Sequence, residues 1–294
     1  MRPTTRRQML AATVVTSAAA SPLLRSLPAC AAAPDRMRLG LCTYLWGKGM
    51  DLPALIKACS DSGLLGVEFR TTHKHGVERS LSTAERKEVR KRLADSPVEW
   101  WGIGSNERFE HTDPKKLQAA INATKDFIKL SADIGGTGVK IKPNAMPKGA
   151  ESIRQIGEAL NTLGPFAKEH GQQIRVEVHG RETSRLPVMK KIMDIATHPS
   201  VAVCWNCNKE DLAGEGLEHN FNLVKDRFGD TVHVRELNIG NYPYPKLVGL
   251  LVAMNYRGWV LLECRTRQKN YVAAMIKQRN LFEKMVAEAK ADAA

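Results

Sequence analysis

The feature that most constrains this chain is a regular alternation of short apolar runs with longer amphipathic runs, from residue 37 to about residue 290. The short runs have strand length and cover 37–43, 65–69, 98–103, 137–142, 173–179, 201–205, 231–237 and 258–264. Helical patterns follow at 51–62, 82–94, 114–134, 150–170, 185–196, 218–228, 244–254 and 270–290. Eight strands, each followed by a helix, predict an α/β fold of the (β/α)8 barrel type, which usually needs about 250 residues.

A doubly wound open sheet is the alternative fold for such an alternation. It would need a glycine-rich turn after the first strand, and the sequence from Thr43 to Gly49, TYLWGKG, does not supply one. No internal repeat, low-complexity stretch or long linker divides the chain after residue 33. We therefore expect one barrel domain over residues 34–294.

Residues 1–33 have the composition of an export signal rather than of a folded element. Arg6 and Arg7 precede a modestly apolar run of Ala, Val and Thr, which resembles a twin-arginine signal. The run is too short and too weakly apolar for a permanent membrane span. Cleavage is expected after the small-x-small site at 29–31, or at Cys30 if the loose lipoprotein box 27–30 is used. We expect a periplasmic protein that contacts membranes only through this signal or a lipid on Cys30; a disordered cytosolic leader is the alternative.

The charge and cysteine content exclude several classes of protein. The formal net charge is +13, and four of the arginines lie in the first 33 residues. The remaining surplus suits a solvated basic surface, such as the helical pattern at 85–92, better than a nucleic-acid site. Five cysteines remain after Cys30, an odd number without framework spacing. Cys204 and Cys207 have redox or zinc spacing but no second pair, so we expect core thiols.

Polar residues gather where the predicted strands end. In the run 173–180, QIRVEVHG, Glu177 alternates with valines, which places it on the opposite face of the strand. His233 and Glu263 lie at the same inward parity in their own strands. Because strand ends converge in a barrel, these three residues favour a metal site. Other residues at strand ends are Trp46, Glu68, Arg70, His73, His75, Lys140, Lys142, His179, Asn206, Lys209, Arg235, Glu236 and Arg265.

Five short motifs carry a resemblance to a known family. They are GVEF at 66–69, VEVHG at 176–180, VCWN at 203–206, HVREL at 233–237 and YRGWVLLE at 256–263. Together they resemble the sugar phosphate isomerase/epimerase family of xylose isomerase-like TIM barrels, and the similarity extends over essentially all of residues 34–294. The paired ending YRGW and LE is its most specific part.

The resemblance implies one divalent cation, of manganese, magnesium, cobalt or zinc, held by residues from strands five to eight. Position by position, these ligands fall on Glu177, Asn206, His233 and Glu263. The chain departs from the family at Asn206, where Asp is usual, and at Lys209, where many members have His. An amide oxygen can ligate a hard cation, but the site loses one negative charge.

The resemblance also implies an isomerase or epimerase of carbohydrate metabolism. The cation would polarise a sugar carbonyl, and Glu177 and Glu263 would exchange protons with the neighbouring carbon as base and acid. The residues expected to contact the small sugar substrate are Trp46, Glu68, Lys142, His179, Lys209, Arg235, Glu236 and Arg265. The sequence leaves the oligomeric state open.

Three other functions share parts of this pattern. A lyase or hydratase acting on keto-glycosides needs the same metal-assisted proton abstraction, and a non-catalytic sugar-binding barrel would explain the loss of Asp at position 206. Endonuclease IV belongs to the same superfamily, and His73, His75 and His111 could supply extra ligands. Its three-metal site needs a His after the sixth strand, where Lys209 stands, so we expect no nucleic-acid partner.

Overall fold

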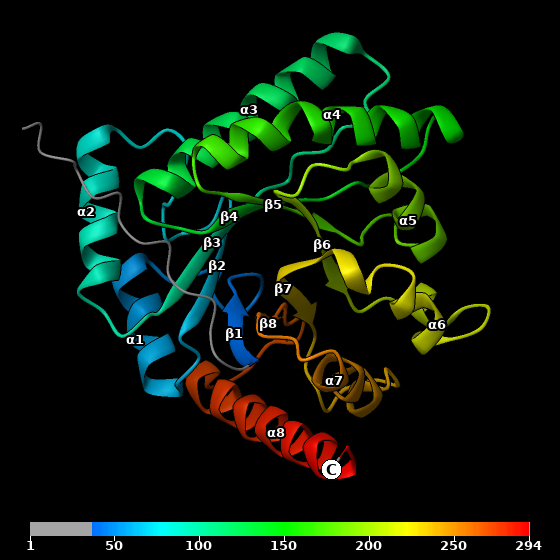
Figure 1. Ribbon diagram of the computed structural model, residues 1–294. Coiled ribbons are helices and arrows are strands. Elements are labelled where there is room, and N and C mark those ends of the chain that lie inside the picture. Colours follow the sequence, from blue (N-terminus) through cyan, green and yellow to red (C-terminus); the bar gives the residue numbers. More distant parts are fainter. Residues whose placement is uncertain (1–36, 294) are drawn as a thin grey trace, which may run out of the picture.

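The computed structural model describes residues 37–293, and these residues form one closed barrel of eight parallel strands. Neighbours in the barrel are neighbours in sequence, and β8 pairs with β1 to close it. Figure 1 shows the strands as a ring with the helices outside it. The predicted (β/α)8 barrel is therefore confirmed, while the predicted export signal lies outside the described residues. Within residues 37–293, no helix is long and apolar enough to span a bilayer.

Strands and helices alternate from one end of the described chain to the other. The strands are β1 (Arg38–Cys42), β2 (Gly66–Arg70), β3 (Trp100–Gly104), β4 (Gly138–Ile141), β5 (Gln173–Glu177), β6 (Val201–Asn206), β7 (Phe228–Val234) and β8 (Trp259–Leu262). The helices are α1 (Leu52–Ser62), α2 (Thr83–Ala94), α3 (Pro114–Asp133), α4 (Ala150–Glu169), α5 (Leu186–Ile195), α6 (Leu217–Asn222), α7 (Tyr244–Ala253) and α8 (Tyr271–Asp292). Two short 3-10 helices, η1 (Lys209–Leu212) and η2 (Lys225–Arg227), flank α6.

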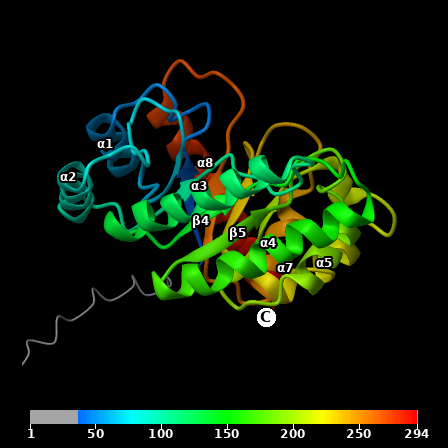
Figure 2. The same ribbon diagram turned by 90° about the horizontal axis from the view of Figure 1, so that it is seen from above.

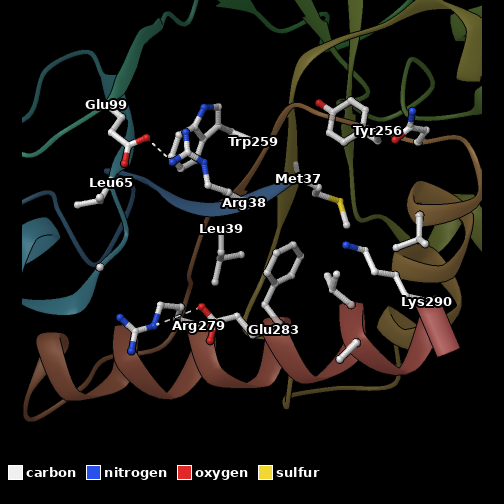
Figure 3. A pocket seen from close by; sticks show the side chains of 16 residues that line it. Met37, Arg38, Leu39, Leu65, Glu99, Tyr256, Trp259, Arg279, Glu283 and Lys290 are labelled. Carbon is white, nitrogen blue, oxygen red and sulfur yellow. Dashed lines mark hydrogen bonds and ion pairs between the residues drawn. The ribbon is translucent and has the colours of Figure 1, made fainter. Parts of the chain in front are cut away.

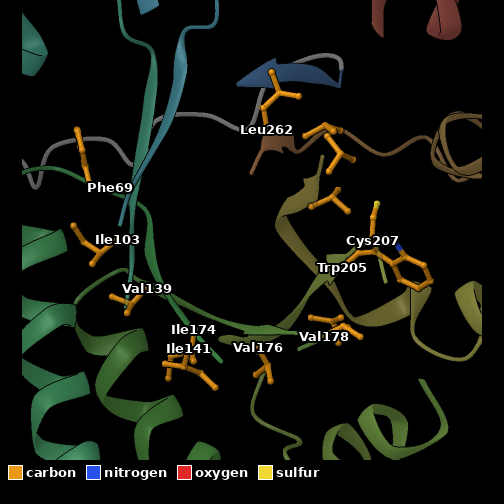
Figure 4. Packing of buried hydrophobic residues seen from close by; sticks show 14 of the residues in the cluster. Phe69, Ile103, Val139, Ile141, Ile174, Val176, Val178, Trp205, Cys207 and Leu262 are labelled. Carbon is orange, nitrogen blue, oxygen red and sulfur yellow. The ribbon is translucent and has the colours of Figure 1, made fainter. Parts of the chain in front are cut away.

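The strand residues alternate between an apolar outer face and a largely polar inner face. Phe69, Ile103 and Val176 point outward from their strands, where they pack in the main core beneath the helices (Figure 4). The helices present apolar residues to the same layer; α3 and α4 lie side by side over one flank of the barrel (Figure 2). The opposite parity of each strand therefore faces the barrel interior, which is where Glu68 and Glu177 lie.

The amino-terminal half of the barrel interior is filled by aromatic rings and one buried cation. The rings of Trp100 and Trp259 stack with centroids 6.2 Å apart, and the Arg175 guanidinium lies 5.0 Å from the Trp100 centroid. Gly66 makes room for this layer, because a Cβ there would lie 2.3 Å from the Trp259 ring. This packed layer closes the lower interior and leaves the carboxyl ends of the strands for chemistry.

The chain between β6 and β7 differs from the sequence prediction. Instead of one helix over 218–228, α6 ends at Asn222 and β7 begins at Phe228. The Phe228 ring packs against the rings of Phe221 and Trp205, with centroid distances of 5.1 and 5.8 Å. A strand places this partly buried ring in the aromatic cluster, and these aromatic contacts outweigh the local helical pattern.

Candidate active site at the carboxyl ends of the strands

Three carboxylates and an imidazole meet inside the barrel near the carboxyl ends of the strands. Glu68, Glu177 and His233 come from β2, β5 and β7 and have no exposed surface, while Glu263 directly follows β8 and is 3% exposed. His233 lies between two of the carboxylates, with Nε2 3.3 Å from Glu68 Oε1 and Nδ1 3.4 Å from Glu177 Oε1. The Cys42 thiol of β1 also donates to Glu68 Oε1, at 3.5 Å.

Two buried cations accompany these carboxylates. Lys140 of β4 is fully buried, and its Nζ lies 2.7 Å from Glu177 Oε2. Arg70 of β2 donates from NH1 to Glu263 Oε1 at 3.1 Å and from NH2 to Asn106 Oδ1 at 3.1 Å. Arg265, whose side chain is 44% exposed, lies 3.6 Å from the other oxygen of Glu263. The site is therefore a network of ion pairs rather than a cluster of free carboxylates.

Gly104 makes the crossing of these side chains through the barrel possible. It pairs in register with Arg70 on one side and with Lys140 on the other. A Cβ at this position would lie 2.5 Å from Glu68 Oε1 and 2.9 Å from Arg70 Cδ. The absence of a side chain on this part of β3 gives space to two charged groups of β2, Glu68 and Arg70.

The ion pairs shift the protonation equilibria of the buried groups. Burial alone would raise the pKa of the Glu177 carboxyl, but the Lys140 ammonium and the His233 ring hold it well below its usual range. Burial also opposes the shift at Glu68, whose pKa falls to about 2 mainly because His233 faces it. The pKa of His233 moves the other way: burial would lower it, but Cys204, Glu68 and Glu177 raise it well above its ordinary value. Glu68 and Glu177 are therefore ionised at neutral pH.

Asn206 ends β6 beside this network. It pairs in register with His233, and its Nδ2 donates to Glu177 Oε1 at 3.0 Å. The two side chains are complementary as donor and acceptor, which a carboxylate at position 206 would not be. The amide therefore acts here as a hydrogen-bond donor to Glu177 and presents its N–H rather than its oxygen to the site.

The residues come close enough for a metal ion but already carry their own counter-ions. Two groups of buried donors have ligand atoms within 4.8 Å of one another: Cys42, Glu68 and His233, and Glu177, His233 and Glu263. Lys140 and Asn206, however, take one oxygen each of Glu177, and two guanidinium groups take those of Glu263. The spacing of the ligand atoms suits a divalent ion. The carboxylate oxygens, however, are already paired with cations and hydrogen-bond donors of the protein. The predicted divalent cation stays a prediction.

The comparisons with known proteins agree with this architecture. The sequence description of the xylose isomerase-like TIM barrels matches residues 56–285. The chain belongs to this family. None of the curated protein sequences matches the chain significantly.

Solved structures with the same barrel include several sugar epimerases. An L-ribulose 3-epimerase superposes with a TM-score of 0.75 at 14% identity, over 87% of this chain and 97% of the other. A 3-keto-D-glucoside 4-epimerase from E. coli gives 0.71 at 13% identity, over 85% and 100%. A D-allulose 3-epimerase from Methylomonas sp. in complex with D-allulose gives 0.71 at 15% identity, over 86% and 98%. At these identities the comparison shows a shared fold.

Several predicted sugar contacts lie around the rim of this xylose isomerase-like barrel. Lys142 and His179 follow β4 and β5 and are half-buried, with His179 Nδ1 3.4 Å from the Pro143 carbonyl. Burial, helped by Arg70, lowers the pKa of Lys142. Lys209 differs from both, because its side chain is 91% exposed and its Nζ lies 3.9 Å from Oε1 of its neighbour Glu210.

Three other predicted contacts lie in the loops that shape the mouth. Trp46 is buried and donates its indole N–H to the Thr266 carbonyl at 2.7 Å. Glu236 accepts from the backbone N–H groups of Arg265 and Thr266 at 3.0 and 2.8 Å. Arg235 is half-buried, and its backbone N–H donates to Tyr244 Oη. Trp46 and Glu236 thus both hold the loop after β8 that carries Arg265.

Lys140 and Arg70, which the sequence places among the strand-end residues, have no role in the family pattern and yet belong to the site. Both stand at strand ends, and both share the inward parity of their strands with the predicted residues. On β4, Val139 and Ile141 belong to the outer core, which leaves Lys140 facing the interior. Strand parity therefore places Lys140 inside the barrel, whereas its pairing with Glu177 follows only from the barrel geometry.

A separate cavity lies at the opposite, amino-terminal end of the barrel (Figure 3). It has a volume of about 510 Å³ and lies between the start of β1, at Arg38 and Leu39, and α8, at Phe282 and Glu283. Glu99 pairs with Arg38 across its wall. None of the clustered carboxylates lines this cavity, so it is not part of the candidate active site.

Proposed function

We propose that this protein is a sugar isomerase or epimerase that moves a proton at a carbon next to a sugar carbonyl. One observation carries the proposal: β5 and the end of β8 bring Glu177 and Glu263 together, with ligand oxygens within 4.8 Å of each other and of His233. Two carboxylates that face a common space can act as base and acid on one substrate carbon. The similarity in fold to solved sugar epimerases supports the same reaction class.

The protein's own residues supply most of what such a proton transfer requires. The Lys140 ammonium keeps Glu177 ionised at neutral pH, as a base must be. Arg70 holds Glu263 in place through Oε1 and reaches Asn106 with its other nitrogen. Half-buried Lys142 and His179 would bind and orient sugar oxygens at the rim, where Arg265 would meet an anionic group.

A divalent cation is the alternative source of positive charge for this reaction. Glu177, His233 and Glu263 would hold manganese, magnesium, cobalt or zinc, joined by Asn206 if its amide turned its oxygen toward the ion, and the ion would polarise the substrate carbonyl when bound. His233 favours this form, because neither ring nitrogen makes a well-formed hydrogen bond within residues 37–293. Elemental analysis of the purified protein distinguishes a metal-dependent site from one that uses only protein charges. One divalent ion per chain would support the metal-dependent site.

Two further alternatives are a keto-glycoside lyase or hydratase and a sugar-binding barrel without catalysis. The similar fold of a 3-keto-D-glucoside 4-epimerase favours keto-glycosides as substrates to be tested. The ion-paired site favours the binding barrel, because each carboxylate already has partners. Proton exchange into a sugar that undergoes neither elimination nor hydration would exclude both the lyase or hydratase and the non-catalytic barrel. Elimination or hydration products would instead identify the lyase or hydratase.

The experiment that tests the proposal is deuterium incorporation from heavy water into D-fructose, D-tagatose and a 3-keto-D-glucoside. Glu177→Gln and Glu263→Gln keep the side-chain shape and remove the base or acid, so each should lower the exchange by about 10²–10⁴-fold. Glu99→Gln, at the amino-terminal end of the barrel, is the matched control and should exchange like the unaltered protein. Undiminished exchange in both site variants would show that these glutamates do not transfer the proton.

We also propose that the protein is exported to the periplasm. Arg6, Arg7 and the apolar run after them support this location. Export by the twin-arginine route would deliver the barrel already folded. Its thiols would then be buried, and its ion pairs formed, before the protein reaches an oxidising compartment.

A further inference from the structure

The clustered charges nearly cancel without any metal ion. Glu68, Glu177 and Glu263 contribute three negative charges, and the buried Lys140 and Arg70 contribute two positive charges. The imidazole of His233 lies between two of the carboxylates and can supply the third. The cluster therefore carries a net charge of −1 or zero. A divalent ion held by His233, which ligates as a neutral imidazole, would bring it to +1, and an uncompensated buried charge is strongly unfavourable.

Lys140 is the residue that creates this balance. Its Nζ is fully buried and 2.7 Å from Glu177 Oε2, an oxygen that a metal would otherwise use. Asn206 fits the same scheme, because its N–H occupies the second oxygen of Glu177 and it adds no negative charge. A chain with an acid at 206 and no lysine at 140 would hold one more negative and one fewer positive charge here, a net charge lower by two units.

We propose that Lys140 and Arg70 are the resident cations of this site and take the electrostatic role of a divalent ion. The inference rests on the proposed function for its chemistry: Arg70 would stabilise the negative charge that develops on the substrate oxygen, while Lys140 would balance the charge of Glu177. Arg70, which is 7% exposed and lies beneath the ring of Tyr44 at 5.5 Å, is the cation nearer to the mouth. Lys140 acts through Glu177 and is a positioning residue.

The test measures metal binding and does not depend on activity. Manganese chloride is titrated by calorimetry into protein that has been treated with EDTA and desalted. The unaltered protein should bind no manganese at micromolar concentrations, whereas Lys140→Met should bind it at least 100-fold more tightly, because Glu177 loses its counter-ion. Arg175→Met removes another fully buried cation, in the lower layer near Asp230, and should gain no manganese affinity.

Three outcomes overturn the inference. Micromolar manganese binding by the unaltered protein would do so even if Lys140→Met failed to fold, and so would equal affinities of the two proteins. Deuterium exchange in EDTA-treated protein is the second measurement, and it should persist without metal. Exchange that appears only after manganese is added would overturn the resident cations but leave the proposed function standing. Absence of exchange under all conditions would remove the proposed function, and the titration would still decide the question of the cations.

Discussion

Replacing Asn206 by Asp tests the ion-paired site most sharply, because it adds one charge and changes almost no volume. Asn206 Nδ2 donates to Glu177 Oε1 at 3.0 Å, so the substitution would set two carboxylate oxygens at that separation. At an effective dielectric constant of about 20, their repulsion is roughly 5–6 kcal/mol. Taking up a proton on the new carboxyl is cheaper, about 4 kcal/mol at pH 7 for a group of ordinary pKa near 4.

The cost of protonating the new carboxyl should therefore set the loss of folding stability. The protonated carboxyl can donate a hydrogen bond to Glu177, as the amide does. The folded state of Asn206→Asp would bind one proton more than the unfolded state between about pH 4 and the raised pKa of the new carboxyl. Its stability should accordingly fall as the pH rises through this window, by about 1.4 kcal/mol per pH unit. The loss relative to the unaltered protein is then about 4 kcal/mol at pH 7 and about 1 kcal/mol at pH 5.

Thermal melting of EDTA-treated proteins at pH 5 and pH 7 measures this loss. A domain of this size should melt lower by roughly 8–16 °C at pH 7 and only a few degrees lower at pH 5. Manganese should raise the melting temperature of Asn206→Asp, since the added carboxylate would ligate it. Asn161→Asp, at a half-buried amide that donates to the Ile195 carbonyl, controls for the exchange itself. Equal melting temperatures of Asn206→Asp and unaltered protein at pH 7 without metal would refute the described contact.

Two further predictions concern other parts of the chain. Burial raises the pKa of Asp211 to about 7, so the folded state holds an extra proton between about pH 4 and pH 7, and stability is lost as the pH rises through that range. Asp211→Asn should flatten this slope, which spans at most roughly 4 kcal/mol, and an unchanged slope in melting temperature between pH 5 and pH 8 would contradict it. Changing Arg6 and Arg7 together to Lys should stop export, measured by cell fractionation; a periplasmic double variant would remove the twin-arginine proposal.

The barrel could be predicted because local sequence patterns mark its strands. Outward residues such as Val139, Ile141 and Val176 alternate with inward polar ones, and most strands are followed by a helix whose boundaries the sequence marks. Ser82, for example, begins α2 with a capping box to Glu85. Such signals involve neighbouring residues only, so one sequence is sufficient to read them.

The internal partners of the candidate site could not be predicted in the same way. Strand parity places Lys140, Arg70 and Glu68 inside the barrel, but it does not say which carboxylate each one meets. That depends on the stagger between strands and on Gly104, whose missing Cβ lets the side chains cross. Likewise, the sequence shows an amide at position 206 but not that its N–H faces Glu177. These contacts are long-range and follow only from the closed barrel.

The buried cations of the barrel interior are paired with carboxylates in both layers, and this limits how the site can change. In the lower layer Arg175 pairs with Asp230 at 3.1 Å, and in the upper layer Lys140 pairs with Glu177. Removing one partner of a buried pair typically costs about 3–5 kcal/mol, whereas changing both together can be nearly neutral. A lysine at 140 and an amide at 206 are thus two halves of one change, since each lowers the negative charge around Glu177. Relatives with Asp at the position of Asn206 should consequently lack a lysine at the position of Lys140. In those relatives a bound divalent cation would supply the positive charge that Lys140 supplies here.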